Sequence, residues 1–179
     1  EYNLFDGWFS YPDFSRPIVF EGGTFNQFGG YVQSTLLFYS SASRYRLAGG
    51  MLYGSVTIPV SAWSGSGGCI WQTGGTNFAS AITLTSNQQG GIGRYFLAGG
   101  SLVSGELDMG FNSYPNVSSS AFEQSGGYHT NGSGIYIDNS HYKLSGGVLN
   151  SSSMILSGGE VSQSGGTNEL RTLTMIFNS

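Results

Sequence analysis

Glu106 and Asp108 are the residues best placed for acid–base chemistry, because no other two carboxylates of this sequence lie so close together. Glycosidases use two carboxylates about 5–10 Å apart. Leu107 and Met109 alternate with the pair, and a strand turns its apolar residues to the core and their neighbours to solvent. We therefore interpret both carboxylates as solvated and predict that the chain is not an enzyme. The enzyme hypothesis, a polysaccharide lyase or hydrolase, ranks third, behind the structural and carbohydrate-binding hypotheses given below.

The histidines and the single cysteine give little support to metal or nucleophilic chemistry. His129 and His141 lie 12 residues apart, without a cluster of cysteines or carboxylates at metal-ligand spacing around them. We expect both histidines at the surface, and neither a metal nor a cofactor. Cys69 has no second cysteine to pair with in this sequence. It is expected to behave as a small buried apolar side chain.

Several aromatic residues fall on positions that are predicted to face outward. Exposed rings among hydroxyl and amide groups suit stacking on sugars or contact with another protein. The alternative, that they cover a corner or pack under a loop, stays open. Trp63 and Trp71 are the candidate glycan contacts. The full set is Trp8, Tyr11, Phe28, Tyr31, Trp63, Trp71 and Phe96.

The composition is that of an ordered protein with a neutral polar surface. Charged residues make up 9% of the chain, against about 25% in an average protein. The 30 glycines are accompanied by 11 tyrosines and 12 phenylalanines, which argues against disorder. The net charge of −4 disfavours nucleic acid and anionic membrane surfaces as partners. No apolar run is long enough to span a membrane, and the first residues do not resemble a signal peptide.

Two short motifs alternate along the chain. The first, Tyr-x-Leu-x-Gly-Gly-x-Leu, occupies residues 45–52, 95–102 and 142–149, with a degenerate copy at 2–9. The second, apolar-x-Gln-x-Gly-Gly, occupies residues 25–30, 70–75, 122–127 and 161–166. Unlike motifs follow one another at intervals of about 20 to 27 residues, a period typical of a stacked array.

The motifs predict strands that end at corners. Apolar residues alternate before each glycine pair, which is a strand pattern, and glycine permits both a positive φ and close stacking of coils. Each Gln shares a strand face with the apolar residue before it, so its buried amide needs a partner such as the corner backbone. A repeated ligand site is the alternative for these glutamines. The structural role is assigned to Gly29, Gly30, Gly49, Gly50, Gly74, Gly75, Gly99, Gly100, Gly126, Gly127, Gly146, Gly147, Gly165, Gly166, Gln27, Gln72, Gln124 and Gln163.

We therefore predict an all-β fold, a single-stranded parallel β-helix (β-solenoid) of about eight coils of 20–25 residues. It forms one domain over residues 1–179, with two-coil repeats at about 2–44, 45–94, 95–141 and 142–179. Because the motifs alternate, each Gln is expected to stack between coils that carry Leu. An antiparallel sandwich is the rival architecture, but it does not predict matched corners.

The alternating glycine-paired motifs resemble the β-solenoid repeats of large bacterial secreted and surface proteins, similar to autotransporter passengers. The resemblance covers nearly the whole chain, except that residues 1–24 and 105–121 depart from the pattern. It implies a secreted or cell-surface location, a scaffolding or adhesive role, and no cofactor.

The favoured hypothesis is an extracellular structural protein. A parallel solenoid has open edges at both ends, which recruit further strands, and the repeats leave little sequence for the polar caps of natural solenoids. We expect either end-to-end self-association of the terminal coils into a fibre or a place in a longer surface rod. The alternative is a carbohydrate-binding or adhesin module, with glycans as partners.

Overall fold

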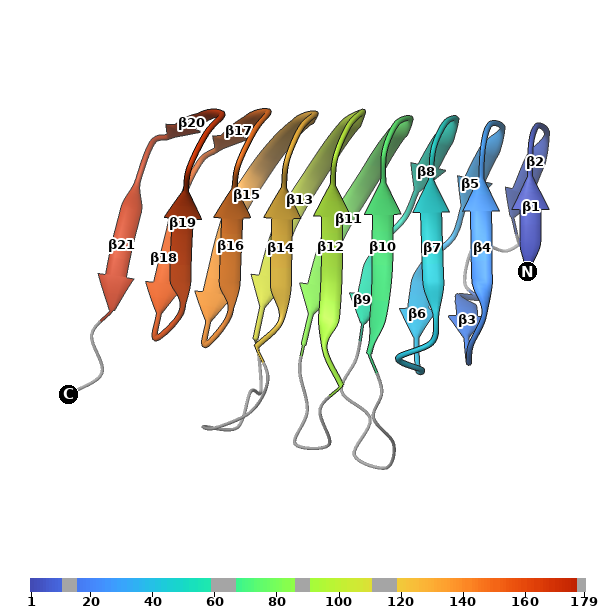
Figure 1. Ribbon diagram of the computed structural model, residues 1–179, viewed down its shortest axis with the longest axis horizontal. Coiled ribbons are helices and arrows are strands. Elements are labelled where there is room, and N and C mark those ends of the chain that lie inside the picture. The colour runs from blue at the N-terminus through green and yellow to red at the C-terminus, as the bar shows by residue number, and fades with distance from the viewer. Residues whose placement is uncertain (11–15, 59–66, 86–90, 111–118, 177–179) are drawn as a thin grey trace.

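The computed structural model describes residues 1–10, 16–58, 67–85, 91–110 and 119–176. All regular elements of this part of the chain are β-strands, and every pairing between them is parallel, apart from one isolated bridge. The strands stack side by side along the long axis of the molecule, with β1 and β21 at opposite ends (Figure 1). The prediction of a single-stranded parallel β-solenoid is thus confirmed.

Eight strands form the first sheet, here called sheet A, in the order β1-β4-β7-β10-β12-β14-β16-β19. Partners within sheet A are 19 residues apart between Tyr142 and Val161 and 27 apart between Tyr95 and Phe122, so coil length varies around the predicted range. The strands of sheet A are β1 (Tyr2–Leu4), β4 (Thr24–Gln27), β7 (Arg44–Leu47), β10 (Gly68–Gln72), β12 (Gly93–Leu97), β14 (Ala121–Gln124), β16 (His141–Leu144) and β19 (Glu160–Gln163).

The second sheet, sheet B, is bent, and most coils cross it in two short strands. Three long strands, β11, β13 and β15, run through the bend without interruption. β13 lies between the other two, β11 also pairs with the short strands β8 and β9, and β15 also pairs with β17 and β18. The first half contains β2 (Trp8–Ser10), β5 (Tyr31–Gln33), β8 (Met51–Tyr53), β17 (Val148–Ser151) and β20 (Thr167–Leu170); the second contains β3 (Ile18–Phe20), β6 (Leu36–Phe38), β9 (Val56–Ile58), β18 (Met154–Ser157) and β21 (Leu173–Ile176); the long strands are Thr76–Leu84, Ser101–Met109 and Tyr128–Asp138.

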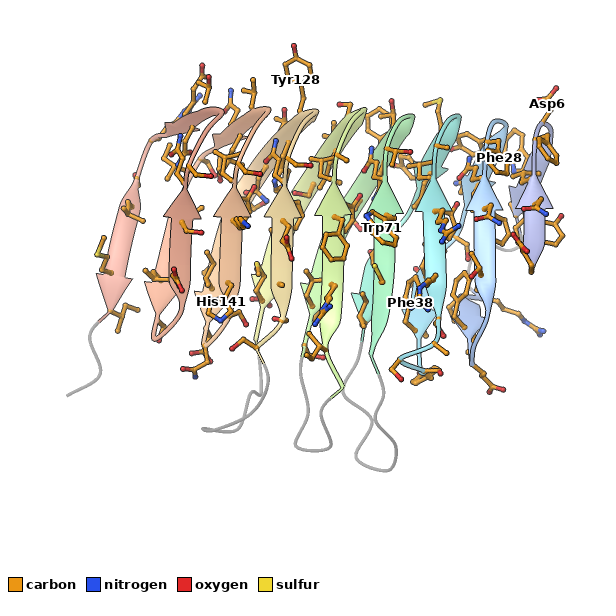
Figure 2. The ribbon with its side chains drawn as sticks, viewed as in Figure 1. Asp6, Phe28, Phe38, Trp71, Tyr128 and His141 are labelled. Carbon is orange, nitrogen blue, oxygen red and sulfur yellow. The ribbon has the colours of Figure 1, made fainter. Side chains whose placement is uncertain are left out.

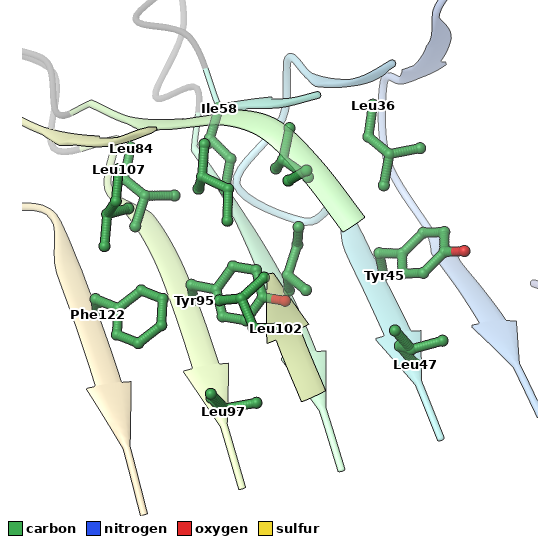
Figure 3. Close-up of a cluster of buried hydrophobic side chains, with 14 of the residues drawn as sticks. Leu36, Tyr45, Leu47, Ile58, Leu84, Tyr95, Leu97, Leu102, Leu107 and Phe122 are labelled. Carbon is green, nitrogen blue, oxygen red and sulfur yellow. The ribbon is translucent and has the colours of Figure 1, made fainter. Parts of the chain in front are cut away.

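The core consists of columns of side chains that repeat from coil to coil. In sheet A, Tyr45 and Tyr95 belong to one column and Leu47 and Leu97 to the next (Figure 3). In sheet B the second half contributes Ile58, Leu84 and Met109, which are likewise buried. Stacking thus places similar apolar side chains of neighbouring coils in contact. The N–H and C=O groups of their backbones are paired by the hydrogen bonds of the parallel strand ladder.

The described residues form no helix that is long and apolar enough to cross a membrane.

Candidate functional site

Both sequence motifs occupy the same place in the coil, at the turn from sheet A to sheet B, here called the glycine corner. In seven coils it contains a glycine pair, and each position excludes a side chain for a different reason. A Cβ on the first glycine would lie 2.1–2.5 Å from a carbonyl oxygen of the preceding coil. The second glycine has a φ of 63–79°, and a Cβ there would meet the preceding corner at 2.3–2.7 Å. The predicted role of the glycine pairs is therefore confirmed.

The first coil departs from this rule. Asp6 stands where the other coils have their first glycine, and Gly7, with a φ of 94°, takes the second place. A Cβ at Gly7 would meet nothing within 4 Å, because none of the described residues stacks on this side of the first coil. Asp6 projects from the end of the stack at this corner (Figure 2).

The four glutamines alternate with leucines along one column, as predicted: Leu4 pairs with Gln27, Gln27 with Leu47, and Leu47 with Gln72. Coils that carry these glutamines are here called Gln coils, and coils with the Tyr-x-Leu motif Tyr coils. Gln27, Gln72 and Gln124 are fully buried, whereas Gln163, in the last coil, is exposed.

Each interior Gln is satisfied by its own corner and by the following Tyr coil. The Gln72 Nε2 group donates to the Gly75 carbonyl oxygen (3.4 Å) and to the Ser101 carbonyl oxygen of the next coil (2.8 Å). Its Oε1 atom accepts a hydrogen bond of 2.5 Å from the Tyr95 hydroxyl. The same bonds connect Gln124 with Tyr142 (3.0 Å).

This bonding explains why the repeat is two coils long. A buried Tyr hydroxyl and a buried Gln amide would each cost free energy alone, but together they satisfy one another. Sequence reasoning had placed the Gln amide on the corner backbone, which is confirmed, but it missed the Tyr donor. The signal was present, because Tyr precedes Leu in Tyr coils, whereas Gln coils have Phe25, Ile70, Phe122 or Val161 in its place.

His129 was predicted to lie at the surface, and this prediction is wrong. Its side chain is buried in sheet B, where it pairs with Leu102 and Leu149 in neighbouring coils. The ring nitrogens contact the Ser104 hydroxyl (2.9 Å) and the Tyr142 hydroxyl (3.2 Å). Burial lowers the pKa of His129 to about 3, so the imidazole is neutral at physiological pH. The network links sheet B to the Gln124–Tyr142 pair.

The remaining candidates for chemistry lie apart from one another. Glu106 is exposed and Asp108 half-buried on the outer face of β13, while Leu107 is buried, as predicted. Burial and the nearby Glu106 charge raise the pKa of Asp108. His141 is exposed and pairs with Glu160 at 3.3 Å. Within the described ranges, no three His, Cys, Asp or Glu side chains gather as metal ligands would.

Cys69 is half-buried on the outer face of sheet A, and so it is less enclosed than predicted. Desolvation raises the pKa of its thiol to about 11, although Arg44 and Arg94 act in the opposite direction. The thiolate is the nucleophilic form of cysteine, so this residue is poorly suited to nucleophilic chemistry at neutral pH.

The outer face of sheet A presents aromatic and basic side chains together. Trp71, 41% exposed, stacks beside Phe96 with ring centroids 5.3 Å apart, and Arg46 lies 5.9 Å from the Trp71 ring. Arg44 and Arg94 flank Cys69 in the neighbouring column. We call these five residues, Arg44, Arg46, Trp71, Arg94 and Phe96, the arginine–aromatic face; Trp71 itself is seen on the front sheet in Figure 2.

Two open grooves border Trp71 on this face. One is lined by Arg44, Cys69 and Arg94, and the other by Phe28, Arg46 and Thr73. The predicted outward orientation also holds for Trp8 and Phe28, while Tyr31 and Phe96 are partly buried. The second candidate glycan contact, Trp63, lies outside the described residues, as does Tyr11.

Comparisons with protein-family models, curated proteins and solved structures give no match to this chain. The resemblance to bacterial surface solenoids therefore stays a prediction.

Proposed function

We propose that this chain is an extracellular structural β-solenoid, a rod segment that is extended by further coils at its ends. The continuous parallel stack supports a mechanical role, because each coil contacts only its neighbours and the array has no inherent end. The candidate catalytic carboxylates Glu106 and Asp108 point to solvent and line none of the grooves described above. A bacterial-like secreted or surface location is part of the same proposal and rests on the repeat pattern.

One observation carries the proposal: core residues are exposed in the outermost coils that the structure describes. Met154 in β18 is 1% exposed, but Leu173, its partner in β21, is 49% exposed, and Met175 is 53% exposed. At the other end, Tyr2, the partner of the buried Phe25, is 48% exposed. Apolar core residues beside an open strand ladder form a surface that recruits further strands.

We expect the chain to associate as its concentration rises, and to do so through the face formed by β19, β20 and β21. Sedimentation velocity and electron microscopy would measure the association and show rods longer than one molecule. The double variant Leu173→Lys/Met175→Lys should remain monomeric, because a strand that docked there would bury two unpaired charges.

The matched control is Met51→Lys/Tyr53→Lys, which adds the same charge to exposed positions of β8 in the middle of the stack. This control should associate as the unmodified chain does. A chain that stays strictly monomeric at high concentration, or a control that loses association equally, would contradict self-association.

A second candidate function is glycan binding at the arginine–aromatic face. Three of the six Lys and Arg residues of a chain with a net charge of −4 gather here, beside two aromatic rings. Aromatic rings stack on sugar faces, and guanidinium groups pair with carboxylates or sulfates. An acidic polysaccharide is therefore the carbohydrate that this face fits best.

We expect Trp71→Ala to weaken binding to an acidic polysaccharide about tenfold, because an aromatic contact and the arginine packed on it are lost. A glycan array followed by titration would measure the change. Tyr128→Ala, which removes an exposed ring at the glycine corner, is the matched control and should bind normally. An array without acidic glycans among its ligands would eliminate this function.

A further inference from the structure

The last coil of the described residues, β19 to β21, is a Gln coil, and no Tyr coil of the described part of the chain stacks on it. In the interior, a Tyr coil always follows a Gln coil: Tyr45 follows Gln27, and Tyr95 follows Gln72. The hydrogen bond always runs from the later Tyr to the earlier Gln. By this order, the coil that would stack on Gln163 is a Tyr coil.

Among the described residues, Gln163 makes neither of the two bonds that a following Tyr coil supplies to an interior Gln. Its Nε2 group keeps the bond to its own corner, at 3.3 Å from the Gly166 carbonyl oxygen. In the interior the same nitrogen also donates to the next coil, as Gln124 does to the Val148 carbonyl oxygen at 2.9 Å. The Oε1 atom of Gln124 accepts a hydrogen bond from the Tyr142 hydroxyl. Within the part of the chain that the structure describes, no Tyr hydroxyl donates to the Oε1 atom of Gln163. Its side chain is exposed, whereas its counterparts are buried.

We infer that the face formed by β19, β20 and β21 is a binding site for one polypeptide coil of the Tyr-x-Leu-x-Gly-Gly type. Such a coil would cover Leu173 and Met175, continue both strand ladders, and bring a Tyr hydroxyl to the Gln163 amide. A second Gln coil offers the same ladder but no donor for Oε1. The inference rests on the proposed function in taking this face as an interface, and it adds which sequence the interface selects.

The first coil of a second copy is a weaker occupant than an interior Tyr coil, although it carries Tyr2 and Leu4, so self-association requires a high concentration of the chain. Stacking demands a glycine at the first corner position, where a Cβ would lie 2.1–2.5 Å from a carbonyl oxygen of the coil below. Asp6 occupies that position. In the same register Glu1 would lie opposite Glu160, and like charges directly opposite destabilise a strand pair. The best occupant therefore has an intact glycine pair.

The test uses two labelled peptides of equal length, taken from this chain. Residues 141–157 form a Tyr coil and residues 160–176 a Gln coil. Fluorescence anisotropy with the full chain should show binding of the first peptide and at least tenfold weaker binding of the second. Leu173→Lys/Met175→Lys in the chain should abolish binding, which locates the site. Equal binding of the two peptides, or binding of neither, would overturn the inference.

A double-mutant cycle tests the Tyr–Gln contact itself. Tyr142→Phe in the peptide should weaken binding up to about tenfold, because it leaves the Gln163 amide oxygen unpaired. With Gln163→Leu in the chain, the Phe peptide should bind at least as well as the Tyr peptide. Gly146→Ala in the peptide should remove binding, because the added Cβ meets the corner below. A Phe peptide that loses affinity equally for both chains would refute the contact.

Self-association separates this inference from the proposed function. Asp6→Gly should strengthen association of the full chain in sedimentation velocity, whereas Asp138→Gly, which removes a carboxylate away from the ends, should not. If all chains stay monomeric while the Tyr peptide binds selectively, self-association is wrong and the selectivity of the face stands. If the chains associate while the two peptides bind alike, the selectivity is wrong and the rod proposal stands.

Discussion

Alanine at Gly100 is expected to lower the free energy of unfolding by about 2–5 kcal/mol, combining a left-handed backbone with overpacking. Gly100 has a φ of 76°, and a Cβ there would lie 2.4 Å from the Gly75 carbonyl oxygen. Backbone atoms form the other side of this contact, so no flexible side chain can move aside. The two coils would have to move apart to relieve this steric clash, and the hydrogen bonds between their strands would then weaken.

Gly7→Ala is the matched control for Gly100→Ala. It occupies the same corner position and has a positive φ of 94°, but a Cβ there meets nothing within 4 Å. We expect a loss of about 1 kcal/mol from the backbone conformation alone. Urea unfolding followed by circular dichroism, at a concentration where the chain is monomeric, would measure both. If the two alanines cost the same, the close stacking of the corners contributes little to stability.

The glycine corners, the parallel stack and the Leu–Gln alternation could be predicted because each follows from local pattern. A glycine pair at a fixed distance after alternating apolar residues leaves few other interpretations than a corner. Counting from the corner then aligns every coil with the next. The same count places Leu102, His129 and Leu149 two residues after their glycine pairs. It would have predicted a buried His129.

The Tyr–Gln bond and the arginine–aromatic face were harder to predict. The bond depends on how far a Tyr side chain reaches across the core between two coils, which residue spacing does not give. The face depends on register, since Arg44 and Arg94 lie 50 residues apart in sequence and become neighbours of Cys69 only in the folded ladder. The partners of an open strand edge are harder still, because the backbone ladder accepts any strand and only the side chains discriminate.

His129 is expected to make the protein less stable as the pH falls below about 6.5. Its pKa is about 3 in the folded chain and about 6.5 when unfolded. Between these values the unfolded state binds a proton that the folded state does not, so falling pH favours unfolding. The loss approaches about 1.4 kcal/mol per pH unit between these two pKa values, on the order of 5 kcal/mol in total. The groups in contact with the ring, Ser104, Phe122 and Tyr142, are uncharged at neutral pH.

His129→Leu tests this expectation, because leucine already occupies the same column in the coils on either side. Ser104 keeps its bond to the Asn131 amide, and Tyr142 keeps its bond to Gln124, so neither hydroxyl is left unpaired. The midpoint temperature of thermal unfolding should therefore fall more steeply between pH 7 and pH 4 for the unmodified chain than for the leucine variant. His141→Asn, at an exposed position, should leave the steep profile in place. Parallel profiles for the leucine variant and the unmodified chain would show that the buried imidazole is not the group that titrates.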